Sequence, residues 1–523
     1  MFTNGAIMKS VKKKLISGKD FAKMRNNLRA MGQKVILCHG VFDLLHYGHI
    51  EHLQEAKSLG DILVVSVTAA QYVNKGPGRP YFNDQQRMRF LASLECVDYV
   101  ILSEAVTVHE VVKSVQPDIY VKGREYAAAE NDVTGNIGPE QDVVEQYGGK
   151  IYFTQGEVYS STRLLNNFFG ALPEDVVTMA HALRAKYGND ITEQIRRMVD
   201  SFRECRVLVI GDVILDDYVF CRVQGLTSKD AAMSTKYESI ERYAGGSLAI
   251  ARHLAGFADK VTLLSMMGNE KDVEEFILDT MPPVECRIVQ EKNYITPVKR
   301  RYLKQHALRQ EYEKLFSVNH LLDIRGMRQV NYERFYRNVD EMLPQYDLVV
   351  VCDYGHGLLN SKAIRKIEKG AEFLAVNCQT NSSNYGMNVI TKYHRADAFV
   401  VDEKELHMPF GQSLLETSDL LAKLGAQLKS KYEWVTLGAH GALGRHNGEK
   451  AKIPAVTLHV KDTVGAGDAF YALAALCAAN SLPVDIATLI SNIAGAIKTN
   501  LVGNSKSVAK VDLLKFLSTI LNV

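Results

Sequence analysis

The sequence lacks the signals of a cross-linked scaffold, of export and of membrane insertion. Its 8 cysteines contain no C-x-x-C pair and are scattered, several of them in apolar runs, so we expect reduced, buried thiols. No apolar segment of signal-peptide length follows Lys12, Lys13 and Lys14. The longest apolar run, 469–479, is far shorter than the ~20 residues that a membrane span needs. We expect a cytoplasmic protein with no membrane partner.

The sequence also has no large excess of positive or of negative charge. Lys plus Arg total 62 and Asp plus Glu total 60, so the net charge of +2 predicts no general attraction to nucleic acid. Any anion must therefore be bound locally. The hydrophobic fraction of 46% and the charged fraction of 23% are typical of globular proteins. The 523 residues exceed one ordinary core, because a domain averages about 150 residues.

Two series of short β-branched runs alternate with amphipathic, helix-sized segments. The first series lies between residues 34 and 152, and the second starts at residue 206. This rhythm is typical of βαβ units around a parallel sheet, so we predict an α/β protein with two domains. Residues 171–202 are charged and helix-prone, without a strand-like run. We predict a first domain over 30–170, a helical linker over 171–202 and a second domain over 203–523.

The strongest local motif runs from Gly40 to His49, between a predicted strand and a predicted helix. Its residues are Gly-Val-Phe-Asp-Leu-Leu-His-Tyr-Gly-His. Glycines let the backbone approach a ligand, and the helix start offers free N–H groups to an anion. His46 and His49 can donate to one phosphate as charge builds on its oxygens. A metal pair and ordinary surface histidines are the other interpretations, although zinc would need a Glu or Cys partner nearby.

Polar residues farther along the chain fit the same site. Each cation alone is typical of a solvated surface, but together they can clamp a triphosphate and a sugar phosphate: Lys75, Arg79, Lys122 and Arg163. Ser161 and Thr162 can cap a helix whose N-terminus faces those phosphates. The pattern therefore predicts a phosphate site in the first domain.

The Gly40–His49 motif resembles the G-x-F-D-x-x-H-x-G-H signature of the cytidylyltransferase-like nucleotidyltransferases, and the resemblance covers about residues 30–168. It implies a Rossmann-like domain in which His46 and His49 stabilise attack of a phosphate on the α-phosphorus of a nucleoside triphosphate. The nucleotide-binding positions that it implies are Gly40, Phe42, Asp43, Lys75, Arg79, Lys122, Ser161, Thr162 and Arg163.

Downstream segments are similar to one subgroup, the sugar 1-phosphate adenylyltransferase half of the ADP-heptose synthases. These segments are 75–80, 85–87, 97–100, 117–123 and 159–163. The chain departs from the subgroup at Arg124-Glu125-Tyr126, where Gly-Asp-Tyr is usual, and at Thr68, where Asn is usual. These departures concern the sugar and the base more than the chemistry. ATP and CTP both stay open as the nucleotide.

A second motif, Asp462-Thr463-Val464-Gly465-Ala466-Gly467-Asp468, runs directly into the long apolar segment. The small residues Gly465, Ala466 and Gly467 can expose successive N–H groups as an anion hole for a transferring phosphoryl group. Asp468 is placed to accept the proton of an attacking hydroxyl. The alternative is a tight turn followed by an ordinary Asp.

This motif is similar to the signature of the ribokinase-type carbohydrate kinases, and other segments follow in the expected order over about residues 203–515. The resemblance implies an α/β/α sandwich with a small β lid from about 217–243 and 295–310. It implies sugar contacts at Asp212, Asp216, Gly245 and Gly246, and nucleotide contacts at Gly438, Gly441, Gly465, Ala466 and Gly467. Asp468 would be the catalytic base.

The second domain departs from the heptose kinases at three places. Gly245-Gly246-Ser247-Leu248-Ala249 replaces G-G-A-A-N and loses a substrate-contacting amide, while Asn377-Cys378-Gln379 replaces Asp-Pro-Lys and loses a positive charge. The usual N-x-x-E becomes Asp402-Glu403-Lys404-Glu405, in which Glu405 can still hold the water shell of Mg²⁺. An inactive or re-purposed kinase domain is the alternative.

Together the resemblances predict a bifunctional enzyme of the ADP-heptose synthase type, with the domain order inverted. One domain would phosphorylate a heptose-phosphate-like sugar with ATP, and the other would join a sugar 1-phosphate to a nucleotide with release of pyrophosphate. Mg²⁺ is implied in both steps. The alternatives are a cytidylyltransferase for a polyol or another sugar phosphate, and a ligand-binding regulator with a degenerate kinase half. We expect sugar phosphates and nucleoside triphosphates as ligands, and a homo-oligomer.

Overall fold

The structure is a computed structural model. It describes residues 11–73, 80–105, 107–124, 137–155, 172–305, 312–411, 414–456, 460, 462–501 and 503–522. The chain divides into two compact units, a first unit of Met1–Val177 with Leu514–Val523 and a second unit of Thr178–Leu513. This division falls inside helix α8 (Glu174–Tyr187), and the domain bounds given above stay a prediction.

The first unit contains a five-stranded parallel sheet in the order β3-β2-β1-β4-β5. The strands are β1 (Val35–Gly40), β2 (Ile62–Thr68), β3 (Tyr99–Ser103), β4 (Ile119–Lys122) and β5 (Lys150–Phe153). The helices are α2 (Gly18–Ala30), α3 (Tyr47–Ser58), α4 (Asp84–Ala92), α5 (His109–Val115) and α6 (Ile137–Gln146). The strand order reverses between β1 and β4, and ligands of open α/β sheets bind at the carboxyl ends of such a pair.

Both faces of this sheet are buried, because consecutive side chains of a strand point to opposite faces. Ile36 and Cys38 pack with residues of α3 and α4 on one face. Val35 and Leu37 pack with residues of α2 and α5 on the other. The continuous apolar run of β1 is therefore the expected sequence of a strand between two helical layers.

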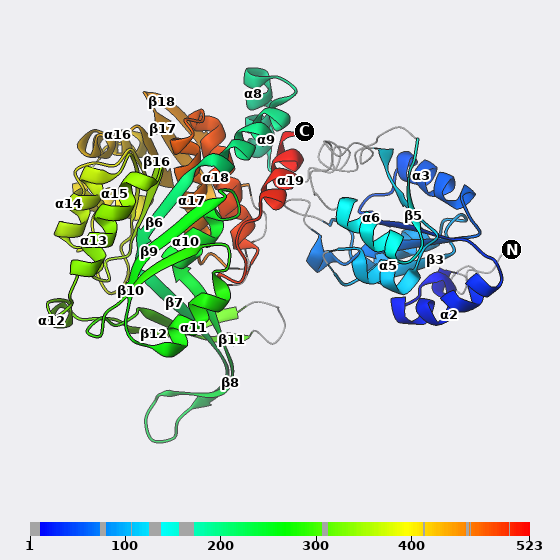
Figure 1. Ribbon diagram of the computed structural model, residues 1–523, viewed down its shortest axis with the longest axis horizontal. Helices are drawn as coiled ribbons and strands as arrows, with labels where there is room; N and C mark the ends of the chain where they lie inside the picture. Colours follow the sequence, from blue (N-terminus) through cyan, green and yellow to red (C-terminus); the bar gives the residue numbers. More distant parts are fainter. Residues whose placement is uncertain are drawn as a thin grey trace. The chain divides into compact units, whose positions relative to one another are not determined.

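The second unit contains a nine-stranded sheet in the order β10-β9-β6-β13-β14-β15-β16-β17-β18 (Figure 1). Its strands from β10 to β16 are parallel, and β17 and β18 are antiparallel. The bounds are β6 (Arg206–Gly211), β9 (Lys260–Met267), β10 (Glu285–Gln290), β13 (Leu348–Asp353), β14 (Phe373–Cys378), β15 (Ala398–Asp402), β16 (Tyr432–Thr436), β17 (Ala442–His446) and β18 (Glu449–Ile453). The strand order reverses between β6 and β13.

Helices cover both faces of the nine-stranded sheet (Figure 1), which confirms the predicted sandwich. One layer contains α13 (Glu333–Met342), α14 (Ser361–Gly370) and α16 (Thr417–Leu428), and the other contains α10 (Ser247–Leu254), α17 (Ala466–Ala479) and α18 (Val484–Thr499). The remaining helices are α9 (Ile191–Ser201), α11 (Lys271–Thr280), α12 (Ile324–Met327), α15 (Glu403–His407) and α19 (Lys510–Leu521). Helix α17 is apolar on every side because residues 469–478 are all buried.

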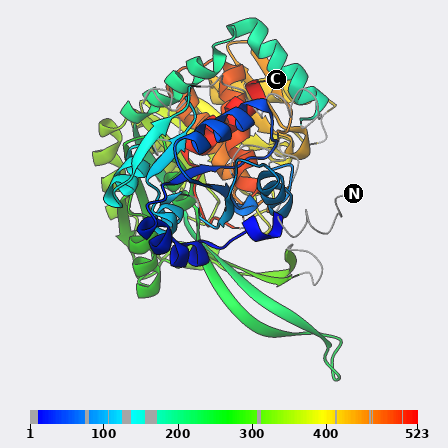
Figure 2. The same cartoon turned by 90° about the vertical axis from the view of Figure 1, so that its right-hand side faces the viewer.

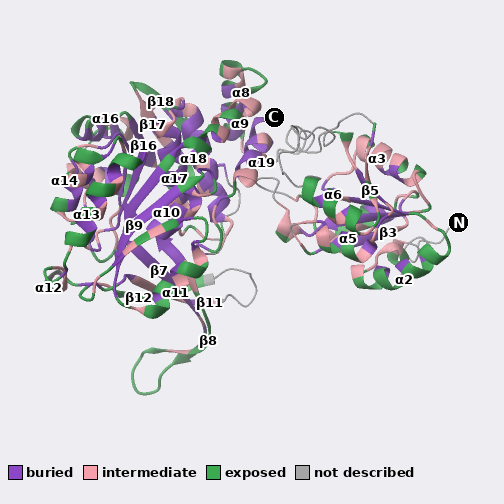
Figure 3. Cartoon of the chain, viewed as in Figure 1, coloured by how far each residue is buried: buried purple, intermediate pink, exposed green. Residues whose placement is uncertain are grey.

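A separate four-stranded sheet, which we call the lid sheet, has the order β12-β11-β7-β8. Its strands are β7 (Val213–Leu226), β8 (Met233–Gly246), β11 (Val298–Gln305) and β12 (Tyr312–His320). Figure 2 shows the paired β7 and β8 projecting from the second unit as a long ribbon. The central strands of the main sheet are buried, whereas the end of this ribbon is exposed (Figure 3). The predicted β lid is confirmed.

The helices of the predicted linker pack with the second unit. Lys186 of α8 forms a 2.7 Å ion pair with Asp485 of α18, and Tyr187 donates a 2.8 Å hydrogen bond to the same carboxylate. Asp200 of α9 pairs with Lys510. These contacts fix residues 186–200 to the second unit.

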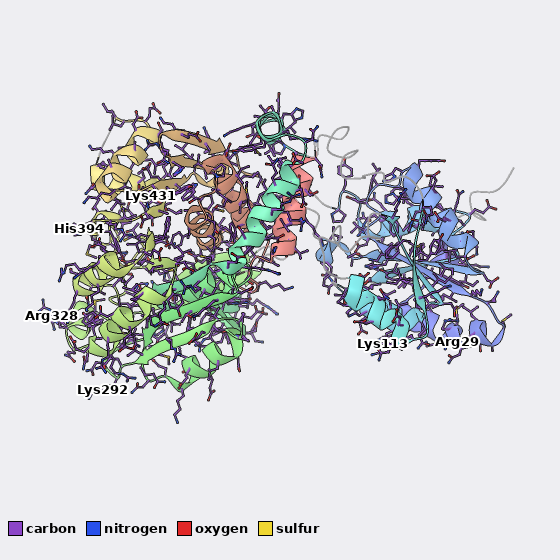
Figure 4. All side chains as sticks on the ribbon, turned by 45° about the horizontal axis from the view of Figure 1, so that its top comes forward. Arg29, Lys113, Lys292, Arg328, His394 and Lys431 are labelled. Atoms are coloured by element: carbon purple, nitrogen blue, oxygen red, sulfur yellow. The ribbon has the colours of Figure 1, made fainter. Side chains whose placement is uncertain are left out.

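Charged side chains lie mostly at the periphery. Figure 4 shows Arg29 and Lys113 at the edge of the first unit, and Lys292 and Arg328 at the edge of the second. All eight cysteines are free; Cys96 and Cys286 are half-buried and the others are buried. Among the helices in the described ranges, none has the length and apolar character needed to cross a bilayer.

Candidate active sites

The loop between β1 and α3 places two imidazoles against each other. His46 is the N-cap of α3, and its ring centroid lies 3.9 Å from that of His49 in the first helical turn. Phe42 has a left-handed backbone with φ 48°, which non-glycine residues adopt only when surrounding contacts hold it. A Cβ atom on Gly40 would lie 3.2 Å from the Phe42 ring. The sharp loop is thus packed so that both histidines meet at the helix start.

A buried arginine from the segment 85–87, which resembles the adenylyltransferase subgroup, holds this loop in place. Arg87 is 0% exposed, and its Nη1 atom donates to the carbonyls of Val41 (2.7 Å) and Thr68 (2.9 Å). Asp43 is also buried and accepts a 3.0 Å hydrogen bond from the Phe82 amide. Because a buried guanidinium must satisfy its donors, these bonds define the loop geometry.

His39 lies at the carboxyl end of β1, beside the reversal in strand order. Its Nδ1 atom is 3.1 Å from Ser66 Oγ, and its Nε2 atom is 3.4 Å from Thr68 Oγ1. Burial, with a smaller contribution from Lys122, lowers the pKa of His39 to about 3, so the ring is neutral near pH 7. Thr68, one of the departures from the adenylyltransferase subgroup, therefore contacts His39 at this strand end.

The predicted phosphate clamp is described at one position. Lys122 ends β4, and its Nζ atom lies 2.6 Å from the Glu140 carboxylate of α6 and 5.1 Å from the Tyr120 ring centroid. Lys75, Arg79, Ser161, Thr162 and Arg163 lie outside the described residues. Their role stays a prediction.

Asp468 lies in the first turn of α17, beside the turn predicted as an anion hole. Gly465 is the N-cap with φ 81°, and the N–H groups of the first turn have no acceptor inside the helix, although the Ala466 amide donates a 3.3 Å hydrogen bond to the Thr463 carbonyl. Asp468 Oδ1 accepts hydrogen bonds from the Tyr354 hydroxyl (2.9 Å) and from Gln379 Nε2 (3.1 Å). Burial raises the pKa of Asp468, whereas these two donors lower it. Both of these hydrogen bonds end on Oδ1.

A cluster of buried polar atoms lies where the strand order reverses in the main sheet. Asp212 follows β6, and its Oδ2 atom accepts bonds from the amides of Tyr354 (3.2 Å) and His356 (3.4 Å), which follow β13. In the described part of the chain, His356 Nε2 is buried without a hydrogen-bond partner, and the buried Tyr294 hydroxyl lies within hydrogen-bond reach of Asp212. Buried polar atoms without partners are costly, so this cluster fits the hydroxyl groups of a polar ligand.

The pKa values in this cluster follow from burial. Desolvation, then repulsion from Asp353, raises the pKa of Asp212 to about 7. Desolvation, then the positive charge of Lys299, lowers the pKa of His356 to about 4. His356 is therefore neutral at pH 7, and its Nε2 atom can donate to or accept from a sugar hydroxyl according to its tautomer.

The lid sheet brings a carboxylate and two cations to the same site. Asp216 of β7 is buried and pairs with Arg301 of β11. A Cβ atom on Gly245 would lie 2.4 Å from Asp216 Oδ2, so only glycine allows this approach. Lys299 lies 5.5 Å above the Tyr354 ring; burial lowers its pKa, which the charge of Asp216 raises. The sequence motifs did not predict Lys299 or Arg301 as site residues.

Gly246, the N-cap of α10, also has a positive φ of 56°. The helix that follows is tied to the site, because Ser247 donates through its amide (3.1 Å) and its hydroxyl (2.9 Å) to the carbonyl of Asp212. Ser247 belongs to the segment that departs from the heptose kinases, and here it fixes the loop that presents Asp212.

An amide-rich loop after β14 holds the loop after β13. Asn381 and Asn384 each donate a 2.8 Å hydrogen bond to the carbonyl of Tyr354. Asn388 donates to the carbonyls of Asp353 (3.1 Å) and Gln379 (2.9 Å). These three asparagines lie close together in the sequence, but they belong to none of the motifs from which the site was predicted.

A lysine from a later part of the chain lies beside the end of β13. Lys392 Nζ lies 2.5 Å from Asp353 Oδ2 and donates a 2.6 Å hydrogen bond to Asn388 Oδ1. Its charge contributes to the electrostatics of Asp212 as well. A cation from a later part of the chain therefore lies beside the end of β13.

The predicted metal residue Glu405 is 7% exposed and takes part in a capping box at the start of α15. Its carboxylate accepts 2.9 Å bonds from the amides of Thr380 and Asp402. Burial, then repulsion from Asp402, raises its pKa to about 7. No group of three or more potential metal-binding side chains occurs among the described residues. Glu405 thus fits an outer, water-mediated contact to a metal better than direct coordination.

Two of the predicted nucleotide-binding glycines, the exposed Gly438 and the buried Gly441, lie in the turn after β16. Gly438 has φ 55° with open space where a Cβ atom would be, whereas a Cβ atom on Gly441 would lie 2.0 Å from the Ile453 carbonyl. Gly467 of the anion turn also faces open space. Gly438 and Gly467 leave room for a ligand, and Gly441 is required by packing.

The sandwich, the lid sheet, and a carboxylate beside a glycine turn at a helix start define a ribokinase-type small-molecule kinase. The first unit, with two histidines at a strand-to-helix loop, has the architecture of a nucleotidyltransferase. The model of the pfkB family carbohydrate kinases matches residues 206–510, and the chain belongs to that family. A model described as cytidylyltransferase-like matches residues 37–167. The protein is an enzyme in which the nucleotidyltransferase-like part precedes the kinase part, as predicted.

Curated relatives match about a quarter of the chain and about a quarter of their own length. The bifunctional protein HldE of Citrifermentans bemidjiense is 42% identical over 126 residues, which are 24% of each chain. HldE of Geobacter metallireducens is 36% identical over 152 residues, 28% of this chain and 29% of the relative. HldE of Aliarcobacter butzleri is 39% identical over 134 residues, 25% of this chain and 28% of the relative.

Solved structures of sugar kinases resemble part of the chain at low identity. Phosphofructokinase-2 from Escherichia coli in complex with substrates and products has a TM-score of 0.48 and 16% identity, covering 60% of this chain and 98% of that one. Ribokinase from Thermotoga maritima has a TM-score of 0.45 and 17% identity, covering 60% of this chain and 99% of that one.

Proposed function

We propose that this enzyme makes a nucleotide-activated sugar. The second unit phosphorylates a hydroxyl of a heptose-phosphate-like sugar with ATP, and the first unit joins a sugar 1-phosphate to the adenylyl group of ATP with release of pyrophosphate. The observation that carries the kinase proposal is Asp468, held through Oδ1 by Tyr354 and Gln379 beside the glycine turn. The bifunctional HldE relatives support the pairing of the two activities.

In the kinase step, Asp212 and His356 Nε2 bind sugar hydroxyls, which gives the buried Nε2 atom the hydrogen bond that it lacks. Asp468 Oδ2 accepts the proton of the attacking hydroxyl. The free N–H groups at the start of α17 bind the transferring phosphoryl group as its charge spreads. The lid sheet, which carries Asp216, shields these groups from water.

Mg²⁺ would enter with the nucleotide, neutralise its phosphates and keep several of its waters. Glu405 is the residue that would accept hydrogen bonds from that water shell, since its carboxylate already bonds two backbone amides. Asp468 contributes to the electrostatics of Glu405, so the two carboxylates belong to one electrostatic site.

In the nucleotidyl step, His46 and His49 donate hydrogen bonds to the α-phosphate as it becomes five-coordinate. The N-terminus of α3 offers its free N–H groups to the same phosphate. Arg87 keeps the loop rigid by binding the carbonyls of Val41 and Thr68. These groups are preorganised, which is how positioned donors lower a barrier.

The kinase proposal is tested with Asp468→Asn in the full chain, using ATP and a panel of sugar phosphates. Loss of a general base predicts a fall in kcat of about 10²- to 10⁴-fold with little change in sugar affinity. Asp419→Asn, on the exposed side of α16, is the matched control. Unchanged ATP-dependent phosphorylation in Asp468→Asn would overturn the assignment.

The nucleotidyl proposal is tested in the Asp468→Asn chain, so that the kinase does not consume ATP. Each nucleoside triphosphate is offered with a panel of sugar 1-phosphates and polyol phosphates, and pyrophosphate release is measured. We expect ATP and a heptose 1-phosphate to react, and His49→Ala to lose this rate. Preference for CTP and a polyol phosphate would favour the cytidylyltransferase alternative. Pyrophosphate release from His49→Ala at the parental rate would overturn the mechanism.

We further propose that the protein works in the cytoplasm as a homo-oligomer. The row Ile240–Val219–Tyr302–Phe316 crosses the lid sheet on the face opposite Asp216. Ile240 is 44% and Phe316 is 47% exposed, so this row presents apolar area to solvent. Light scattering of the parent and of Phe316→Lys tests the oligomer, because a charge at this row should release subunits.

A further inference from the structure

A lysine is buried beneath the glycine turn of the kinase site. Lys498, near the end of α18, is 0% exposed and lies in an otherwise apolar part of that helix. Its Nζ atom donates to the carbonyls of Val464 (3.0 Å) and Gly503 (2.5 Å). Lysine is almost never fully buried unless its charge is paired or hydrogen-bonded, so nearby groups must compensate the buried charge of Lys498.

The carboxylate of Asp462 binds the same two residues, Val464 and Gly503, through their amide groups. It accepts hydrogen bonds from the Val464 amide (3.0 Å) and from the Gly503 amide (2.8 Å). Asp462 therefore takes the N–H groups, and Lys498 takes the carbonyls. Val464 and Gly503 are held from both sides by one anion and one cation.

This arrangement directly supports the anion turn. Val464 precedes Gly465, the N-cap of α17, and a Cβ atom on Gly465 would lie 3.2 Å from Lys498 Cε. The lysine stem thus packs under the turn while its charged end fixes the preceding carbonyl. Burial lowers the pKa of Lys498, and the charges of Asp462 and Asp468 oppose this by favouring the ammonium form.

We propose that Lys498 is a positioning residue whose ammonium group is a built-in monovalent cation for phosphoryl transfer. It holds the Val464–Gly467 backbone in the conformation that binds the phosphoryl group, and its fixed charge balances the charge that builds there. Two backbone carbonyls and a nearby carboxylate are oxygen ligands of the kind that alkali cations bind. An ammonium tied to the fold supplies that charge without a bound ion. This inference rests on the proposed kinase function.

The test compares Lys498→Met, which removes the charge, with Lys498→Gln, which keeps a neutral donor. Loss of the support for an anion site predicts a fall in kcat of about 10²-fold for Lys498→Met, with the KM of the sugar nearly unchanged. Added K⁺ or NH₄⁺ should restore about a tenth or more of the parental kcat, because either ion can enter the space between the carbonyls. Tetramethylammonium at equal ionic strength should not. Lys369→Met, on the exposed side of α14, is the control and should match the parent.

A second measurement does not depend on activity. The melting temperature of Lys498→Met should rise saturably with K⁺ or NH₄⁺, whereas that of the parent should not, because only a folded chain with an open cation site gains from the ion. If the parent protein shows no ATP-dependent phosphorylation, the kinase proposal is wrong, but the comparison of melting temperatures still tests whether Lys498 occupies a cation site. The inference is overturned if Lys498→Gln equals the parent, or if neither ion restores the kcat or the melting temperature of Lys498→Met.

Discussion

Gln379 donates a 3.1 Å hydrogen bond to Asp468 Oδ1, although 89 residues separate them in the chain. The Tyr354 hydroxyl donates to the same oxygen. Two donors on one oxygen stabilise the carboxylate and restrict its orientation. Gln379 lies where the heptose kinases carry a lysine, so the altered segment binds the Asp468 carboxylate through a neutral side chain.

Removing either donor should shift the acidic limb of the kinase pH profile. Gln379→Leu and Tyr354→Phe each remove a bond that lowers the pKa of Asp468, so that pKa should rise. A base with a raised pKa is protonated at higher pH, and the fall of kcat/KM on the acid side should therefore begin at higher pH in both variants. Rates from about pH 5 to about pH 9 measure this. An unmoved acidic limb would exclude a positioning role.

Gly245→Ala should weaken sugar binding. The new methyl group would lie 2.4 Å from Asp216 Oδ2, so the carboxylate or the lid strand must move. We expect the KM of the sugar to rise about 10-fold or more, as for the loss of a hydrogen bond to a charged group. Gly138→Ala, where the added Cβ meets nothing within 4 Å, is the control in steady-state kinetics. Equal KM values in the two variants would contradict the role of Asp216 in sugar binding.

Arg87→Met should destabilise the first unit without affecting the kinase. It leaves buried carbonyls of Val41 and Thr68 without their donor, a cost of about 1–3 kcal/mol for each unsatisfied group. Urea denaturation should show an earlier transition for the first unit, and pyrophosphate release should fall. Arg89→Met, exposed on the same helix, should behave like the parent. A matching loss of ATP-dependent phosphorylation would mean that the effect is not local.

Asp212→Asn should gain stability relative to the parent as pH rises. Burial raises the pKa of Asp212 from 3.8 to about 7, so the folded state holds a proton that the unfolded state releases over that range. The parent is therefore progressively destabilised between about pH 4 and about pH 7 by this group, and the variant is not. Denaturant midpoints at about pH 5 and about pH 8 test the sign. A stability difference that does not change between these values would contradict the raised pKa.

The sequence predicts a site well when the residues of that site lie close together in the chain. His46 with His49, and Gly465 with Asp468, lie within one strand-to-helix or loop-to-helix connection, so a short motif contains both the geometry and the chemistry. The apolar runs likewise predict the two α/β units, because a strand covered on both faces must be apolar throughout.

The residues that the sequence does not reveal act across long separations. Lys498 reaches Val464 over 34 residues, and Asn381 reaches Tyr354 over 27. Neither belongs to a recognisable motif, and a lysine in a helix is ordinarily read as a surface charge. Lys122 shows the same limit, since its contact with Glu140 depends on how α6 packs against β4.

The paired strands β7 and β8 are each 14 residues long, and they connect two distant places in the second unit. At one end Asp216 lies against Gly245, and at the other Leu226 and Met233 are 70% and 51% exposed. The ladder that pairs the two strands has register shifts between Phe220 and Cys221 and between Val223 and Gly225. Displacement of the exposed end can therefore be absorbed at these bulges, so that Asp216 and Gly245 keep their contact while the end of the ribbon moves.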